Sequence, residues 1–243
     1  GQRLISLLAQ KAAEGVEVRL VYDSAGCFGT TLKFFDSIIK AGGHVYKFHP
    51  PTLRPIGLNY NYRNHRKIVV IDGRIGYLGG MNVGKEYMSL DPNYSPWRDA
   101  HLRLVGDAVW DLQHRFFRDY FMVCEDKRDE VHSQSNLDHY FTASLVTTIC
   151  PIQIVSDGPD TPTDDIKLAF VKMMQTATKS IRIQTPYFIP DQLFLETLKI
   201  AAYSGVKVEV MIPTIADHHY VYRTTTSFIH ELLEANIDVY LYK

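Results

Sequence analysis

Two residues near the middle of the first half have types and a spacing that could do chemistry on a phosphate ester. His65 and Lys67 lie two positions apart, and in an extended chain such side chains point to the same face. An imidazole, whose ordinary pKa is about 6.5, can act as a nucleophile or carry a proton. A neighbouring lysine supplies a fixed positive charge and three donors. The pair therefore suits reaction at a phosphoryl group.

The residues that follow this pair extend the candidate site. Gly79 and Gly80 allow close approach of the backbone to a ligand, and Asn82 adds an amide donor directly after them, as stabilisation of an oxyanion requires. Asp72 is seven positions from His65 and has the opposite parity in a straight strand. We therefore expect Asp72 to act from behind the site or to stabilise a turn.

Alternating strand and helix patterns must position these residues. Apolar periodicity predicts helices that end at Gly15 and Gly42, and further helices over 107–123, 163–178 and 191–203. Strands are predicted over 16–22, 44–48, 67–72, 74–80, 149–155, 180–188 and 206–212. An Asp-Gly pair at 72–73 predicts a hairpin turn. Strands that alternate with helices imply an α/β layered fold.

The two halves of the chain resemble each other. An offset of 190 aligns residues 1–20 with 191–210, with identical residues at six of the twenty positions, including Gly15 and Gly205. An offset of 194 aligns Phe34, Ala41, Val45 and Tyr46 with Phe228, Ala235, Val239 and Tyr240. We predict an internal duplication, against the alternative of a chance similarity between two α/β units.

Composition narrows the classes of protein. The 243 residues are 46% hydrophobic and carry a net charge of -1, which excludes disorder and disfavours a nonspecific nuclease. The three cysteines are far apart and form no CxxC, so neither a disulfide framework nor a zinc site is indicated, and a reducing compartment fits best. No apolar run approaches the ~18 residues of a membrane span, so we expect any membrane contact of this chain to be peripheral.

The stretch NHRKIVVIDGRIGYLGGMN carries a specific gapped pattern. It reads His-x-Lys, four residues, Asp, six residues, Gly, with Asn three positions further, and His65, Lys67, Asp72, Gly79 and Asn82 fit it in full. In this it resembles the phospholipase D superfamily. The flanks NYNYR and PWRDAHLRLVGDAV, with TPYFIPD in the second half, are similar to the bacterial cardiolipin synthases of that superfamily, across nearly the whole chain.

The resemblance implies a mixed β-sheet flanked by helices, in two homologous repeats, and a phosphohistidine mechanism without metal or other cofactor. By that likeness His65 is the nucleophile or the acid/base partner, with Lys67 and Asp72 as the other catalytic residues. A second histidine, from the other repeat, is implied to protonate the departing alcohol and to activate the acceptor.

The resemblance also implies the groups around the histidine. Lys67 and Asn82 would hold phosphate oxygens, and Asp99 would be the carboxylate behind the histidine. Gly80 and Arg63 are further candidates for substrate binding, Arg63 because it lies near the motif and could contact a lipid phosphate. Arg66, which has the parity opposite to His65, is expected to face away.

The implied reaction joins two phosphatidylglycerol molecules into cardiolipin and glycerol, at the cytoplasmic face of a bacterial cell membrane. No nucleic-acid partner is expected. Two alternatives remain open. One is hydrolysis of a lipid or nucleic-acid diester by a phospholipase D-type enzyme, and the other is a membrane-associated scaffold that kept one motif and lost the other.

The expected domain organisation follows from the repeat alignment. Residues 1–123 are predicted to be a first repeat without its opening strand, 124–143 a linker, and 144–243 the first part of a second repeat. No second His-x-Lys motif is present, and the alignment would place its histidine near position 259 (65 + 194). We therefore expect this sequence to be an internal fragment that is inactive alone. We expect the parent protein to pair two repeats within one chain. A further hypothesis is a dimer of two fragments that pairs His65 with His65.

Two weaker candidate groups lie outside the motif. Tyr60 and Tyr62, with Leu53 and Leu58, could line an acyl-chain entrance or pack on their own domain. His218 and His219, beside Asp217, could suggest a metal, but adjacent histidines project differently and no carboxylate set has ligand spacing. A solvated role, or one at the border of the site, is favoured for them.

Overall fold

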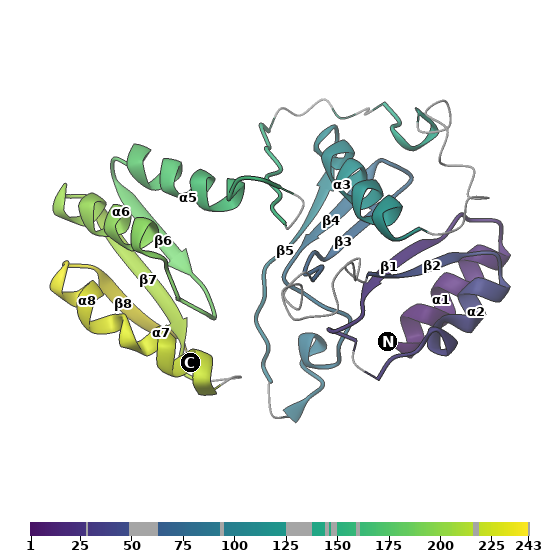
Figure 1. The fold of residues 1–243 in the computed structure, drawn as a ribbon, viewed down its shortest axis with the longest axis horizontal. Helices are drawn as coiled ribbons and strands as arrows, with labels where there is room; N and C mark the ends of the chain where they lie inside the picture. The colour runs from purple at the N-terminus through teal and green to yellow at the C-terminus, as the bar shows by residue number, and fades with distance from the viewer. Residues whose placement is uncertain are drawn as a thin grey trace. The chain divides into compact units, whose positions relative to one another are not determined.

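The computed structural model describes residues 1–27, 29–48, 63–92, 95–124, 138–143, 146, 150–158, 161–215 and 219–242. They form two compact units, Gly1–Ile154 and Val155–Lys243 (Figure 1). Each unit combines β-strands with helices, and both parallel and antiparallel pairings occur. The predicted class, an α/β fold of mixed β-structure flanked by helices, is confirmed.

The first unit begins with two helix-to-strand steps. They comprise α1 (Gln2–Ala13), β1 (Arg19–Asp23), a 3-10 helix (Leu32–Phe35), α2 (Asp36–Lys40) and β2 (His44–Phe48). β1 and β2 are parallel, with Arg19 opposite His44. Ile5, Tyr22 and Ile38 are buried together between helices and strands. The helical spacing and the strand alternation thus place their apolar residues in one core.

A three-stranded antiparallel sheet follows in the same unit. Its strands are β3 (Ile68–Ile71), β4 (Ile75–Gly79) and β5 (His101–Val105), in that order, and short 3-10 helices lie at Glu86–Met88 and Asp138–Tyr140. Helix α3 (Ala108–Val123) contacts β2 as well as all three of these strands. Val109 and Leu112 of α3 are fully buried against the sheet. Helix α3 therefore connects the parallel pair to the strands that follow the His-x-Lys motif.

The predicted hairpin at Asp72 and Gly73 is confirmed. Both residues have positive φ angles, 54° and 63°, as the two central residues of a type I′ turn require. A Cβ at Gly73 would overlap the carbonyl oxygen of Tyr140. This turn therefore needs glycine for two reasons, its backbone conformation and its close packing.

Gly73→Ala should accordingly lower the free energy of unfolding more than a glycine substitution that meets only one of these constraints. We expect a loss of about 2–5 kcal/mol, about 1–2 from the left-handed backbone and the rest from the overlap. Gly15→Ala is the matched control, because Gly15 has a φ of 91° but open space around its Cβ position. Urea unfolding of both variants checks this, and equal losses would contradict the role of the Tyr140 contact.

The second unit is built around a parallel sheet. Its elements are α5 (Asp165–Thr176), β6 (Ser180–Gln184), α6 (Gln192–Tyr203), β7 (Lys207–Pro213), α7 (His219–Ser227), α8 (Ile229–Glu234) and β8 (Asp238–Tyr242), with strand order β6-β7-β8. Leu198, Val210 and Leu232 are buried in its core. Asp191 caps α6 by accepting a hydrogen bond from the Phe194 amide at 2.9 Å.

The strand registers of the two units correspond. Arg19 faces His44 in the first unit, and Glu209 faces Asp238 in the second. The offsets of 190 and 194 found in the sequence carry the first pair onto the second. Positive φ angles also recur at equivalent positions: 91° at Gly15 and 87° at Gly205, 93° at Gly42 and 58° at Asn236.

The strand predicted over 149–155 is wrong. Residues 150–158 form neither helix nor strand, although Ile154 packs on the core beside α3. Pro151 cannot donate to a β-ladder, and no strand of the described part of the chain pairs with this segment. An alternating apolar pattern alone therefore did not suffice to form a strand here.

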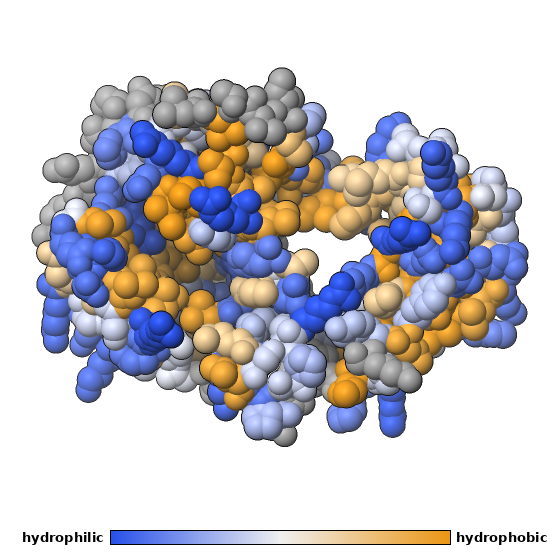
Figure 2. Space-filling view, turned by 180° about the vertical axis from the view of Figure 1, so that it is seen from behind, coloured by the Kyte–Doolittle hydropathy of each residue, from blue (hydrophilic) through white to orange (hydrophobic). Residues whose placement is uncertain are grey.

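The surface of each unit mixes apolar and polar residues. Figure 2 shows orange and blue residues interspersed on the face in view of both units. Across the described residues, no helix combines the length and the apolar character that crossing a membrane requires.

Candidate active site

The candidate histidine lies in a segment without helix or strand, 63–67, that leads into β3. The His65 side chain is exposed and that of Lys67 is half-buried. Lys67 donates a hydrogen bond from Nζ to the His65 carbonyl oxygen at 2.7 Å. Arg66, in contrast, reaches Asp119 of α3, with Nη1 3.3 Å from Oδ2. Arg66 thus points into the contact with α3, as its parity predicts.

The electrostatic surroundings of His65 favour its neutral form. Desolvation by the surrounding protein lowers the pKa of His65 although the residue is exposed, and the nearby positive charges of Lys67 and Arg63 lower it further, while Asp23 acts in the opposite direction. A neutral imidazole has a free lone pair, which nucleophilic attack requires. The site therefore keeps His65 in its reactive form to lower pH than an isolated histidine.

We expect the measured pKa of His65 to lie below about 6.5, the ordinary value. Because the positive charge of Lys67 disfavours a second positive charge nearby, Lys67→Met should raise the pKa of His65. Lys47→Met, at an exposed position of β2, should leave it unchanged. Titration of isotope-labelled histidines by NMR measures both. A pKa above 7 in the unsubstituted protein would contradict this account.

Lys67 interacts with two carboxylates. Burial lowers the pKa of Lys67, and the negative charges of Asp99 and Asp23 act against that change. Asp99 accepts hydrogen bonds from the Ala100 amide at 2.7 Å and from Trp97 Nε1 at 3.3 Å. The structure therefore brings the lysine of the motif within the field of Asp99.

Gly80 and the Asp99 side chain are packed closely together. A Cβ at Gly80 would overlap the Asp99 carboxylate, so the carboxylate lies directly against the glycine backbone. Gly79 faces His101 across the β4–β5 ladder, and a Cβ there would overlap the Ala100 carbonyl and His101. The two glycines thus allow β5 and its preceding loop to pack closely beside the motif.

The other predicted site residues, Arg63, Asn82 and Asp72, lie at different distances from His65 and Lys67. Arg63 Nη2 lies 3.2 Å from Asp23 Oδ1, next to His65. Asn82 is exposed and donates from Nδ2 to the Tyr87 hydroxyl at 2.6 Å. Asp72 lies in the β3–β4 turn, beyond the far end of β3 from His65. With a rise of about 3.3 Å per strand residue, the structure does not bring Asp72 to His65.

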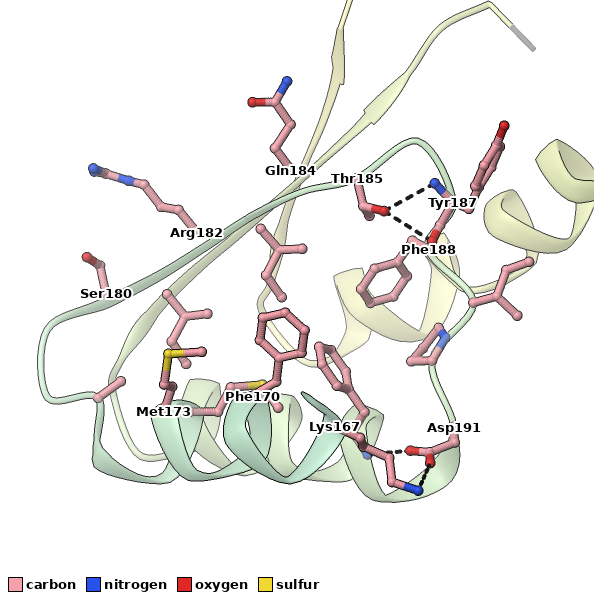
Figure 3. Close-up of a pocket in the computed structure, with 17 residues that line it drawn as sticks. Lys167, Phe170, Met173, Ser180, Arg182, Gln184, Thr185, Tyr187, Phe188 and Asp191 are labelled. Atoms are coloured by element: carbon pink, nitrogen blue, oxygen red, sulfur yellow. Dashed lines mark hydrogen bonds and ion pairs between the residues drawn. The ribbon is translucent and has the colours of Figure 1, made fainter. Parts of the chain in front are cut away.

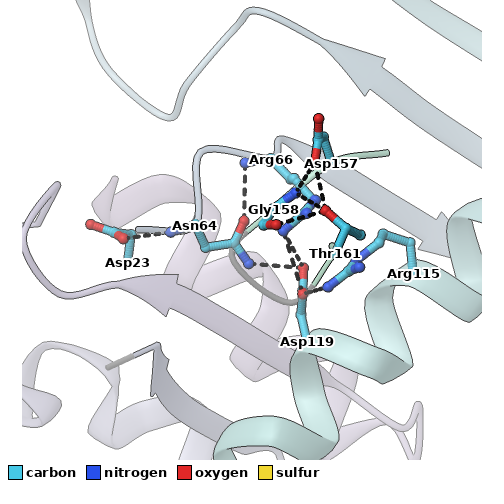
Figure 4. Close-up of polar contacts among 8 residues, drawn as sticks. All are labelled: Asp23, Asn64, Arg66, Arg115, Asp119, Asp157, Gly158 and Thr161. Carbon is cyan, nitrogen blue, oxygen red and sulfur yellow. Dashed lines mark hydrogen bonds and ion pairs between the residues drawn. The ribbon is translucent and has the colours of Figure 1, made fainter. Parts of the chain in front are cut away.

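Asp23 and Asp119, which the sequence analysis did not single out, hold the segment 63–67 in place (Figure 4). Asp23, at the end of β1, accepts a hydrogen bond from the Asn64 amide at 2.9 Å. Asn64 Nδ2 donates to Asp119 Oδ2 at 3.0 Å. Arg115 and Asp119, four residues apart on the buried face of α3, are opposite charges on an apolar stripe. That spacing was a usable indication of a buried ion pair.

A separate cavity of about 790 Å³ lies in the second unit, between α5 and the segment 180–191 (Figure 3). The aromatic side chains of Phe170 and Phe188 line it, and an ion pair between Lys167 and Asp191 at 3.2 Å lies at one end. No predicted site residue lines this cavity. Within the described ranges, no three His, Cys, Asp or Glu side chains gather as metal ligands would.

Comparison with known families gives a match over most of the chain. Residues 1–94 and 170–243 match the family described as "Cardiolipin synthase, PLD-like domain". The major cardiolipin synthase ClsA of Bacillus subtilis (strain 168) is 46% identical over the whole chain, and a cardiolipin synthase of Listeria monocytogenes serotype 4a (strain HCC23) is 43% identical. The chain spans 49% of the length of each relative.

Two solved structures share the fold. The phosphatidylserine synthase of Haemophilus influenzae Rd KW20 matches with a TM-score of 0.53 and 11% identity, covering 99% of this chain and 71% of the other. The polyphosphate kinase of Porphyromonas gingivalis matches with a TM-score of 0.52 and 15% identity, covering 86% of this chain and 28% of the other. At these identities the likeness is one of fold.

Proposed function

This chain belongs to the family of cardiolipin synthase PLD-like domains, and we propose that it carries one half of a phosphatidyltransferase site. The reaction joins two phosphatidylglycerol molecules and releases glycerol, giving cardiolipin. One observation carries the proposal: an accessible histidine, with its pKa lowered, lies beside a lysine in a family-matched motif.

The proposed reaction has two steps, and His65 takes part in both. A ring nitrogen of His65 attacks the phosphorus of the first phosphatidylglycerol, and the bond from phosphorus to the glycerol headgroup breaks. The leaving glycerol oxygen takes a proton from a general acid, for which we propose a histidine of the other repeat. That group then removes a proton from the second lipid's hydroxyl, whose oxygen attacks phosphorus and frees His65.

The neighbouring residues take supporting roles in this proposal. Lys67 stabilises charge that develops on the phosphate oxygens, assisted by Arg63 and Asn82. Asp99, against Gly80, would orient the site from behind the motif. Asp72 also belongs to the sequence motif. Because it lies in the β3–β4 turn, its proposed role is to stabilise that hairpin.

We propose that two related repeats form the complete site within one protein, with 1–123 as the first, 124–143 as a linker and 144–243 as part of the second. The matching strand registers of the two units support this duplication. The lipid substrate requires association with a membrane, and we propose the cytoplasmic face of the bacterial cell membrane.

Phosphatidyl transfer can be tested with the full-length protein that contains this sequence, in vesicles of phosphatidylglycerol. Cardiolipin and glycerol in equal amounts are the expected products. Phosphatidic acid in place of cardiolipin would indicate that water is the acceptor, and hence a hydrolase. If no lipid is turned over, a nuclease assay would distinguish a diesterase for nucleic acid from a non-catalytic scaffold.

A further inference from the structure

Both side chains that flank His65 contact the same buried carboxylate. Asn64 Nδ2 donates to Asp119 Oδ2 at 3.0 Å, and Arg66 Nη1 lies 3.3 Å from the same oxygen (Figure 4). The Asn64 side chain also accepts a hydrogen bond from the Arg66 amide at 3.0 Å through Oδ1. The backbone of His65 is thus fixed on both sides.

Asp119 is suited to hold this segment rigidly. Its side chain is 5% exposed, and its partner Arg115, one turn earlier on α3, is 4% exposed. A buried carboxylate is stable only where donors surround it, and here Arg115, Arg66 and Asn64 supply them. Moving Asn64 or Arg66 away would leave a buried charge undercompensated, so the structure resists displacement of the segment.

We infer that Asp119 is a positioning residue for His65: it holds Asn64 and Arg66 on the α3 side and so directs His65 and Lys67 to the opposite side. The inference rests on the proposed function for His65. Misplacement of a reacting group by about 1 Å can reduce a rate about 10²-fold. Disturbing Asp119 should therefore lower kcat while KM changes little, because the Asp119 side chain is buried and acts only through the segment that carries His65.

A side-chain exchange between Asn64 and Asp119 tests the inference. Asp119→Asn removes the negative charge that Arg66 and Arg115 contact, although its amide oxygen can still accept from Asn64. Asn64→Asp puts two carboxylates opposite each other and removes the donor to Asp119, so each single variant weakens the contacts around Asp119. Together, N64D and D119N restore a donor–acceptor pair in the reverse direction and keep the total charge. Asp111→Asn is the matched control, because Asp111 is an exposed aspartate on the same helix.

Two measurements on the full-length protein are compared: hydrogen exchange of the amides in 63–67 by mass spectrometry, and steady-state phosphatidyl transfer. We expect each single variant to speed exchange at least about 10-fold and to lower kcat about 10- to 100-fold. The double variant N64D/D119N should recover most of the protection from hydrogen exchange and most of kcat. Asp111→Asn should match the unsubstituted protein in both measurements.

The inference would be overturned if amide hydrogen exchange were unchanged in both single variants. It would also be overturned if the losses of kcat in the two single variants multiplied in the double variant N64D/D119N. If Asp119→Asn does not fold, Asn64→Asp alone still gives the exchange result, because Asn64 is only half-buried. Absence of phosphatidyl transfer in the unsubstituted protein would instead contradict the proposed function. Hydrogen exchange would still decide whether Asp119 positions the segment.

Discussion

Replacing His65 with glutamine should reduce phosphatidyl transfer by about 10⁴-fold or more, because removal of a nucleophile abolishes the covalent route altogether. Glutamine keeps much of the volume and polarity of the imidazole but forms no phosphohistidine. His65 is exposed and its side chain fills no core, so the free energy of unfolding should change by less than about 0.5 kcal/mol. Loss of activity and retained stability together would identify a chemical role.

The covalent intermediate gives a direct measurement of this effect. Phosphatidylglycerol labelled in its phosphate should transfer label to the full-length protein, and the label should be acid-labile and absent from His65→Gln. His114→Gln is the control, since His114 is an exposed histidine on α3. Retention of label in His65→Gln would show that His65 is the acid/base partner and not the nucleophile.

Replacing Lys67 with methionine should lower kcat about 10²- to 10³-fold, the usual cost of removing one preorganised donor from developing negative charge. The half-buried ammonium lies in the field of Asp99 and Asp23, and methionine keeps the apolar stem without the charge. Lys67→Arg keeps the charge but not the compact ammonium that donates to the His65 carbonyl, so it should recover only part of the rate.

Two comparisons separate the expected fall in kcat of Lys67→Met from a general loss of positive charge or of stability. Lys47→Met removes a lysine of the same unit from an exposed strand position and should retain full activity. Thermal unfolding of Lys67→Met should remain close to that of the unsubstituted protein. If Lys67→Met retains more than a tenth of the activity, the phosphate charge must be stabilised by other groups, for which Arg63 and Asn82 are the candidates.

The strands and helices that carry the motif were predictable from local patterns. The helix ending at Gly15, the hairpin at Asp72 and Gly73 and the helix before Cys124 all form as predicted. Their periodicity and turn chemistry act over a few residues, so neighbouring residues suffice to specify them. Residues 150–155 have the same kind of pattern, but no strand in the described part of the chain pairs with them, which no local pattern reveals.

The sequence by itself determined which two residues are proposed to react. The types of His65 and Lys67, their spacing and the glycines that follow are a local property of the chain, and they sufficed to predict phosphoryl chemistry. The tertiary structure decided how that pair is held. Asp23 and Asp119 contact Asn64 from 41 and 55 residues away, and Asp72 is separated from His65 by the length of β3. Such contacts depend on how α3 packs beside β1 and β3, because burial creates the need for each charge to be compensated.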